Sequence, residues 1–228
     1  DDRPWAAHLY GSIGLVTVTD NHLDEIEASL GIVGPAALGE QAQKFVHTHV
    51  TPSSPTPHGW SNQLNHEPTF SLGWQRRFPD YMSVDAGGLS LSASPYYGAT
   101  LGNVHTFADV GINFRLTPEK DVWQDGPLRV KPGLPGTGYF DTPDDGWSWY
   151  LFGGVEGRAV ARNIFLDGNT FSDSHSVDKH HFVADINGGL AMTYDRYRMS
   201  YTMVYRTKEF EGQDDPAVFG AVSFGVRF

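Results

Sequence analysis

A short segment near the start of the chain, GEQAQKFVHTHV at positions 39–50, contains a glycine, a glutamine and a histidine that could form part of an active site. Gly39, Gln43 and His47 follow one another at intervals of four residues, so on a helix they lie along one side. A histidine can accept and release a proton near neutral pH, a glutamine can position a neighbouring group, and a glycine allows close approach. Most histidines on helices are solvated or structural, so the spacing alone leaves both a catalytic and a structural role open for His47.

The sequence around this segment predicts a short amphipathic helix. Gly34 and Pro35 end a strand and open the helix, because a proline in the first turn loses no hydrogen bond. One stripe is polar (Glu40, Gln43, Lys44, His47) and a second is mostly apolar (Leu38, Ala42, Phe45, His49). We expect the apolar stripe to lie on another element while Gln43 and His47 point to one spot. His49, about 200° around the helix from His47, should point away and pack at an interface.

Composition narrows the class of protein. The chain has 228 residues, a net charge of -11 and no cysteine, which excludes disulfides, thiolate metal sites and cysteine nucleophiles. An acidic chain without a P-loop or a dinucleotide fingerprint predicts no nucleic-acid partner. The sequence has no apolar run long enough for a transmembrane helix, whereas its 26 glycines and many aromatic residues suit a membrane β-barrel.

Two-residue alternation recurs along the chain. In the last segment, Val218, Val222 and Phe224 share one face, while Ser223 and Arg227 share the other. Similar alternation at 104–116, 147–162, 182–194 and 198–208 places charged residues on the less apolar face. A soluble β-sandwich would fill its inner face with hydrophobic residues, and it remains the alternative as a binding module. The pattern favours an all-β fold, an antiparallel transmembrane β-barrel with its apolar side chains toward lipid.

The alternation predicts about nine strands, at 5–19, 23–33, 69–78, 83–93, 104–116, 147–162, 182–194, 198–208 and 217–228, with a further hairpin around 128–131. Single-chain bacterial barrels have an even number of strands. The odd number and the start without Met lead us to expect one barrel domain over 1–228 that lacks its N-terminal strands. Counting back from a periplasmic C-terminus places segment 34–67, with its helix, in an external loop.

Several stretches resemble the outer-membrane lipid A 3'-O-deacylase family. They are DRPWA at 2–6, Gly34-Pro35 followed by Gly39-x-x-x-Gln43-x-x-x-His47, GWSNQL at 59–64 with NHEP at 65–68, LGNV at 101–104, GGVEGRAVARNIFLDGNTF at 153–171 and YRTKEFEGQ at 205–213. These stretches spread over nearly the whole chain, and the run at 153–171 is the most specific of them.

The resemblance implies a twelve-stranded barrel in the bacterial outer membrane that hydrolyses a 3'-linked acyl chain of lipid A, with calcium as cofactor. Its partners would be lipopolysaccharide and outer-membrane lipid, and it would act as a monomer. His47 corresponds to the family histidine that activates water, which makes it the general base, and Gln43 to its positioning neighbour. Gly39, Trp60 and Asn62 become candidates for binding the substrate, although Trp60 equally suits a loop anchor.

Other active-site residues of the family precede the DRP stretch at 2–4, so the chain by itself is expected to be an incomplete, inactive enzyme. The resemblance assigns no calcium ligand in this sequence. A non-enzymatic barrel that acts as a pore or an adhesin is the alternative function.

Four other patterns in the sequence concern possible nucleophiles, metal sites and the barrel interior. No G-x-S-x-G turn presents a serine nucleophile. Adjacent histidines His180 and His181 would face opposite sides of a strand, so they indicate a loop end rather than a metal pair. The sequence at 167–169 (DGN) predicts a turn rather than a calcium loop. Glu156, Arg158 and Arg162 predict a ladder of charges in the lumen of the barrel.

Overall fold

The computed structural model of the chain describes residues 2–49, 59–118, 140–142 and 146–228. In chain order the elements are β1 (His8–Val18), β2 (Leu23–Val33), η1 (Pro35–Ala37), α1 (Gly39–His49), η2 (Trp60–Asn62), β3 (Glu67–Arg77), β4 (Met82–Ala86), β5 (Leu89–Gly102), β6 (His105–Thr117), β7 (Trp147–Asn163), α2 (Ile164–Asp167), β8 (Phe182–Tyr194), β9 (Tyr197–Arg206) and β10 (Ala217–Val226). In this part of the chain, no helix is long and apolar enough to cross a membrane.

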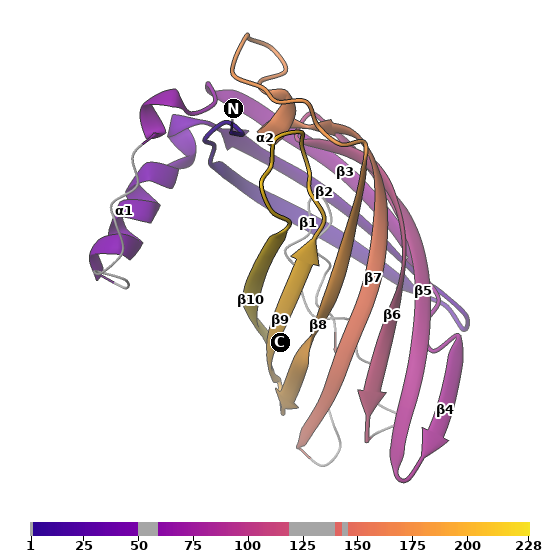
Figure 1. Ribbon diagram of the computed structural model, residues 1–228. Helices are drawn as coiled ribbons and strands as arrows, with labels where there is room; N and C mark the ends of the chain where they lie inside the picture. Colours follow the sequence, from indigo (N-terminus) through magenta and orange to yellow (C-terminus); the bar gives the residue numbers. More distant parts are fainter. Residues whose placement is uncertain (1, 50–58, 119–139, 143–145) are drawn as a thin grey trace.

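The strands form one antiparallel sheet in the order β1-β2-β3-β5-β6-β7-β8-β9-β10, and β4 lies off this path, paired with β5. Strands that are adjacent along the path are antiparallel, as in an up-and-down barrel. The sheet curls into a half-barrel with β1 and β10 at its two edges, and α1 projects beside it (Figure 1). The predicted antiparallel all-β architecture with one short helix is confirmed.

Apolar side chains cover the outer face of the curled sheet, and polar ones fill the inner face. On β10, Val222 is 65% exposed, whereas Arg198 on the neighbouring β9 is 4% exposed. Along β9 the burial alternates at every residue, with Met and Tyr outward and Arg, Ser and Thr inward. A soluble sandwich buries its apolar face, so this orientation confirms the predicted inversion and contradicts the sandwich alternative.

One predicted strand is wrong. The segment 83–93 is not continuous, because the chain reverses at Gly87 and Gly88, both with positive φ (61° and 82°). Two consecutive residues with φ above zero make a tight hairpin turn, so Met82–Ala86 folds back on the start of β5. The rest of β5, to Gly102, was not included in any predicted strand, yet it pairs with both β3 and β6. The predicted hairpin around 128–131 lies outside the described residues.

The two ends of the half-barrel differ. Tight turns at 19–22, 87–88 and 195–196 lie at one end, while α1, α2 and the long β7–β8 and β9–β10 connections gather at the other (Figure 1). A small apolar core at this second end, called here the rim core, comprises Val33, Leu64, Val104 and Ile164. The sheet itself has its apolar surface outside, so this core anchors the connections at the α1 end. The assignment of this end to the cell exterior stays a prediction.

Candidate active site

The segment just before α1, residues 34–38, attaches the helix to the half-barrel through backbone contacts. Gly34 has a φ of 96°, which favours glycine, and its N–H donates to the carbonyl of Ala7 at 3.0 Å. Pro35–Ala37 then makes a 3₁₀ turn, and Leu38 takes a left-handed conformation before the α-helix begins at Gly39. The sequence therefore predicted the opening at Gly34 and Pro35, but α1 itself begins four residues after Pro35.

Gly39, Gln43 and Trp60 form a three-residue contact, called here the tryptophan contact. The Trp60 indole N–H donates to Oε1 of Gln43 at 2.8 Å. At Gly39, an added Cβ would overlap the Cβ of Ala7 and would lie 2.7 Å from the Trp60 ring. Only a glycine therefore lets the helix lie this close to Trp60. The structure brings these three predicted residues together and holds the polar stripe of α1 in one orientation.

Trp5 supports Trp60 from the other side, and sequence reasoning gave it no role. The two indole rings meet edge to face with centroids 5.2 Å apart. The Trp5 carbonyl accepts the Leu64 N–H at 2.8 Å, and a Cβ at Gly59 would lie 2.6 Å from the Trp5 ring. Trp5 lies within the DRPWA stretch that resembles the family, which was the signal available in the sequence. Trp60 is thus both a loop anchor and a partner of α1.

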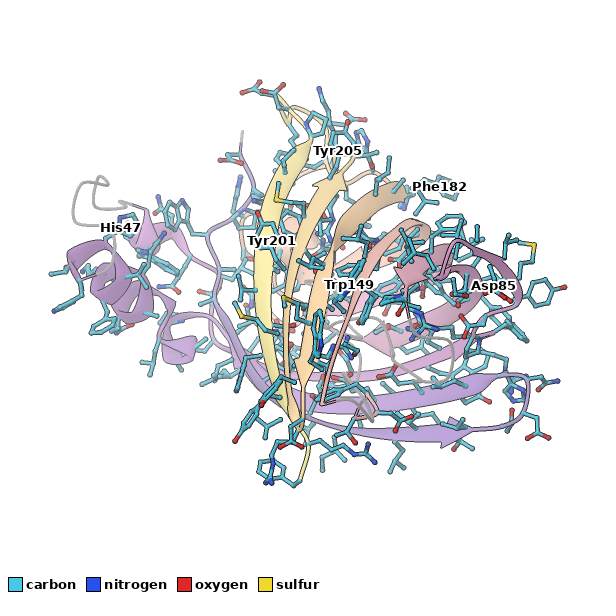
Figure 2. The ribbon with its side chains drawn as sticks, turned by 90° about the horizontal axis from the view of Figure 1, so that it is seen from below. His47, Asp85, Trp149, Phe182, Tyr201 and Tyr205 are labelled. Carbon is cyan, nitrogen blue, oxygen red and sulfur yellow. The ribbon has the colours of Figure 1, made fainter. Side chains whose placement is uncertain are left out.

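His47 lies one turn beyond Gln43 on the same stripe and does not take part in the tryptophan contact. Its Nδ1 atom is buried and makes no hydrogen bond with the described residues. Figure 2 shows His47 on the helix that projects beyond the edge of the sheet. Its predicted role as a base is compatible with this placement but stays a prediction.

The apolar stripe of α1 is not packed as expected. No residue of α1 is buried, and Phe45 is 61% exposed. Its ring stacks instead on His49, with centroids 4.5 Å apart, and Nδ1 of His49 lies 3.0 Å from the Phe45 carbonyl. Within the described residues His49 therefore contacts its own helix, and its predicted packing at an interface stays a prediction.

Asn62 lies apart from the tryptophan contact. It helps to line a cavity of about 520 Å³, together with Arg3, Trp5, Asn65 and His175. The predicted substrate-binding residues therefore divide between two places, with Gly39 on α1, Trp60 packed against that helix, and Asn62 in this cavity. Their role in binding stays a prediction.

A buried carboxylate at the α1 end, which sequence reasoning did not single out, joins two loops to the sheet. Glu67 accepts hydrogen bonds from Asn103 Nδ2 at 2.8 Å, from the Thr170 N–H at 2.7 Å and from Asn169 Nδ2 at 3.1 Å. Asn169 also exchanges two bonds with the backbone of Asn65, at 2.8 and 3.0 Å. The DGN sequence is therefore part of a structural latch between the two connections. Where a turn was predicted, Asp167 ends the short helix α2 and Gly168 is its C-cap residue.

The predicted ladder of charges on the inner face is confirmed for Glu156 and Arg158, which belong to a larger buried ion network. Arg158 binds Glu156 at 2.8 Å and Asp185 at 2.9 Å, and Asp185 also binds Arg206 at 2.9 Å. Arg162 was expected in this ladder, and that expectation is wrong. Near the end of β7 its guanidinium reaches the loop carbonyl of Gly168 at 2.7 Å, because the neighbouring connection folds back over the strand end.

Comparison with known proteins decides the family. The family model described as "Outer membrane protein LpxR" matches residues 1–228. The chain belongs to the LpxR family. The solved structure of LpxR from Salmonella typhimurium is 20% identical in sequence, with a TM-score of 0.82 over 100% of this chain and 75% of that one. A search of curated proteins finds no match.

Membership of the LpxR family confirms the resemblance found in the sequence and places the protein in the outer membrane. The likeness to LpxR from Salmonella typhimurium confirms the barrel architecture. The LpxR match does not extend to the predicted roles of Gln43 and His47, which rest on their positions along α1.

The described residues around α1 do not assemble a calcium site. Calcium takes six to eight oxygen ligands, with carboxylates foremost. Within the described residues, no three His, Cys, Asp or Glu side chains gather as metal ligands. The Gln43 amide oxygen accepts from Trp60, and the nearby Glu40 carboxylate is paired with Lys44 at 2.6 Å. Calcium stays a prediction, and no reaction step is derived through it.

Proposed function

We infer that the protein hydrolyses the 3'-linked acyl ester of lipid A, with His47 as the general base. The LpxR family match over 228 residues supports the substrate class. The observation that carries the proposal is the tryptophan contact, because it fixes the orientation of the stripe on which His47 lies. A base must be held in place before it can act on a bound ester.

The reaction follows from the residues of the stripe. Nδ1 of His47 is buried, so the proposal assigns the contact with water to the other ring nitrogen, Nε2. Nε2 takes a proton as the water oxygen bonds to the ester carbonyl carbon. When the bond between that carbon and the sugar oxygen breaks, the proton passes to the sugar oxygen. The products are a free fatty acid and a 3'-hydroxyl group, and His47 returns to its neutral form.

The curled sheet suits a lipid substrate. Its outer wall is apolar, so ester-bearing lipids of the bilayer surround the half-barrel. The rim core and the Glu67 latch fix the connections at the α1 end, next to the helix. We therefore expect α1, which projects beside the sheet, to meet the ester linkages below a lipid head group.

The test is the position of the acyl chain that is lost. The full-length protein is incorporated into vesicles that contain hexa-acylated lipid A, and the lipid is analysed by mass spectrometry with fragmentation. Loss of one acyl group from the 3' oxygen is the expected result. Solute conductance across the vesicle membrane without any change in lipid mass would overturn the proposal and favour a pore.

A further inference from the structure

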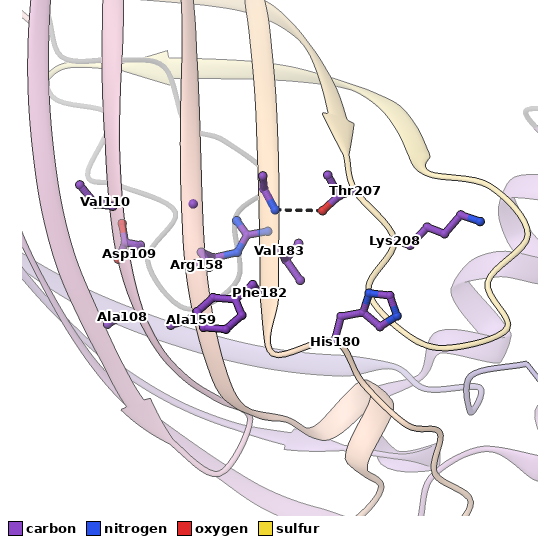
Figure 3. A pocket seen from close by; sticks show the side chains of 12 residues that line it. Ala108, Asp109, Val110, Arg158, Ala159, His180, Phe182, Val183, Thr207 and Lys208 are labelled. Atoms are coloured by element: carbon purple, nitrogen blue, oxygen red, sulfur yellow. Dashed lines mark hydrogen bonds between the residues drawn. The ribbon is translucent and has the colours of Figure 1, made fainter.

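An apolar groove lies on the outer wall of the half-barrel, across β6, β7 and β8. Its volume is about 790 Å³, within the range of about 300–1,000 Å³ that is typical of ligand pockets. Figure 3 shows its lining side chains, with Ala108 and Val110 from β6, Ala159 from β7 and Phe182 from β8. The groove is separate from the candidate active site, because α1 follows β2 and contributes no lining residue.

The strand register explains why the wall is hollow here. Two rows of outward-facing residues cross the three strands, Ala108–Ala159–Phe182 and Val110–Gly157–Ala184. The next row toward the tight-turn end is Ile112–Val155–Ile186, all of them large. At Gly157 an added Cβ would meet no atom within 4 Å, so the groove floor is open to the surroundings.

A positively charged side chain, that of Lys208, lies where the groove comes closest to the α1 end of the half-barrel. Lys208 and His180 lie beyond the strand ends, where Thr207 accepts the Ala184 N–H at 2.9 Å (Figure 3). The nearby Lys179 is neutralised by Asp167 at 2.7 Å, and the guanidinium of Arg158 points to the inner face, where it binds Asp185. Lys208 is exposed, and no carboxylate of the described residues is paired with it.

We propose that this groove binds one acyl chain of an anionic, phosphate-bearing bilayer lipid, with Lys208 contacting the phosphate. The groove supplies apolar walls that face the hydrocarbon region, and the cation lies where the head group would begin. A basic side chain next to an anionic lipid surface contributes to binding, while the apolar walls select for chain methylenes. The site does not depend on hydrolysis and is independent of the proposed function.

The first test fills the groove. Gly157→Leu places a side chain in the groove without a backbone clash, and Gly188→Leu is the matched control. Gly188 faces outward two cross-strand rows away, where an added Cβ would make only an ordinary contact of 3.6 Å. Binding of phosphatidylglycerol to the full-length protein in detergent is measured by native mass spectrometry. We expect Gly157→Leu to weaken it about tenfold, since roughly two methylene groups lose their burial, and the control to leave it unchanged.

The second test removes the charge and does not change the groove. Lys208→Gln is expected to weaken phosphatidylglycerol binding about fivefold and to leave phosphatidylcholine binding unchanged. The control is Arg196→Gln, which removes an exposed positive charge from the tight turn at the opposite end of the half-barrel. It should change the binding of neither phosphatidylglycerol nor phosphatidylcholine. Equal effects of Gly157→Leu and Gly188→Leu on lipid binding would overturn the proposal that the acyl chain lies in this groove. Equal binding of the two lipids by the unmodified protein would overturn the role of Lys208.

Discussion

The buried ion network gives the sharpest test of how the inner face is held together. Asp185 accepts from Arg158 at 2.9 and 3.0 Å and from Arg206 at 2.9 and 2.9 Å. All three residues are less than a tenth exposed. Asp185→Asn keeps the size of the side chain but removes the negative charge, so two guanidinium groups share fewer counter-charges on the inner face.

The expected cost follows from this loss of charge. Removing one partner of a buried pair destabilises a protein by about 3–5 kcal/mol, because a buried charge is left without compensation. At about 1.4 kcal/mol for each factor of ten, the unfolding equilibrium should shift by roughly a hundredfold to a few thousandfold. Urea unfolding of the full-length protein in vesicles measures this, with the fluorescence of the chain's 6 tryptophans as the signal.

Two controls separate the network from a general effect of charge. Asp215→Asn removes an exposed carboxylate and should change stability by less than about 0.5 kcal/mol. Combining Asp185→Asn with Arg206→Gln restores the balance of charge and should recover part of the loss. A cost for Asp185→Asn no larger than that for Asp215→Asn would refute the reasoning.

Two further changes test the α1 end. Gly39→Leu should push α1 away from Trp60 and lower kcat/KM for lipid A deacylation about a hundredfold, since a displacement of about 1 Å can have this effect. Ala42→Leu, on the exposed side of α1, is the control and should change kcat/KM little. Equal rates for the two variants would contradict the role of the tryptophan contact. Glu67→Gln should lower the stability of the latch by about 1–3 kcal/mol, because backbone and side-chain donors lose their carboxylate acceptor. The loss should appear as faster hydrogen exchange at the Thr170 amide. Unchanged exchange at that amide would show that the carboxylate does not hold the loop.

Strong alternation made most of the sheet predictable from the sequence. In β8 and β9 large apolar residues face lipid while charged residues face inward, so the two-residue period is plain in the sequence. In β5 the inward positions include Ser90, Ser92 and Thr100, and small residues also lie on its outer face. The contrast between the two faces is then weak, and the segment, with Pro95 in it, resembles a loop.

The contacts of the candidate site were only partly predictable. Helical spacing placed Gly39, Gln43 and His47 on one stripe, but it could not reveal which residue packs against that stripe. Trp60 and Trp5 are brought there by the connection after α1 and by the segment before β1. That no described element covers Phe45 is likewise a property of the tertiary arrangement, which a periodic pattern does not contain.

Arg162 and the outer groove show two further limits of pattern reasoning. Alternation assigned Arg162 to the lumen, but near the end of β7 its partners are set by the loop that folds over it. Alternation also treats Ala, Gly and Val alike as apolar, whereas the groove arises from their different volumes. Register between strands, which the sequence does not reveal, decides where small residues meet.

The central claim is that His47 is the base that activates water at the 3'-linked ester. The most direct measurement compares kcat for release of that acyl chain by the full-length protein and by its His47→Ala and His49→Ala variants, with folding checked in the same membranes. His47→Ala should lower kcat by about 10²–10⁴, the usual contribution of a general base, while His49→Ala should stay close to the unmodified protein. Equal rates for the two variants would contradict the claim.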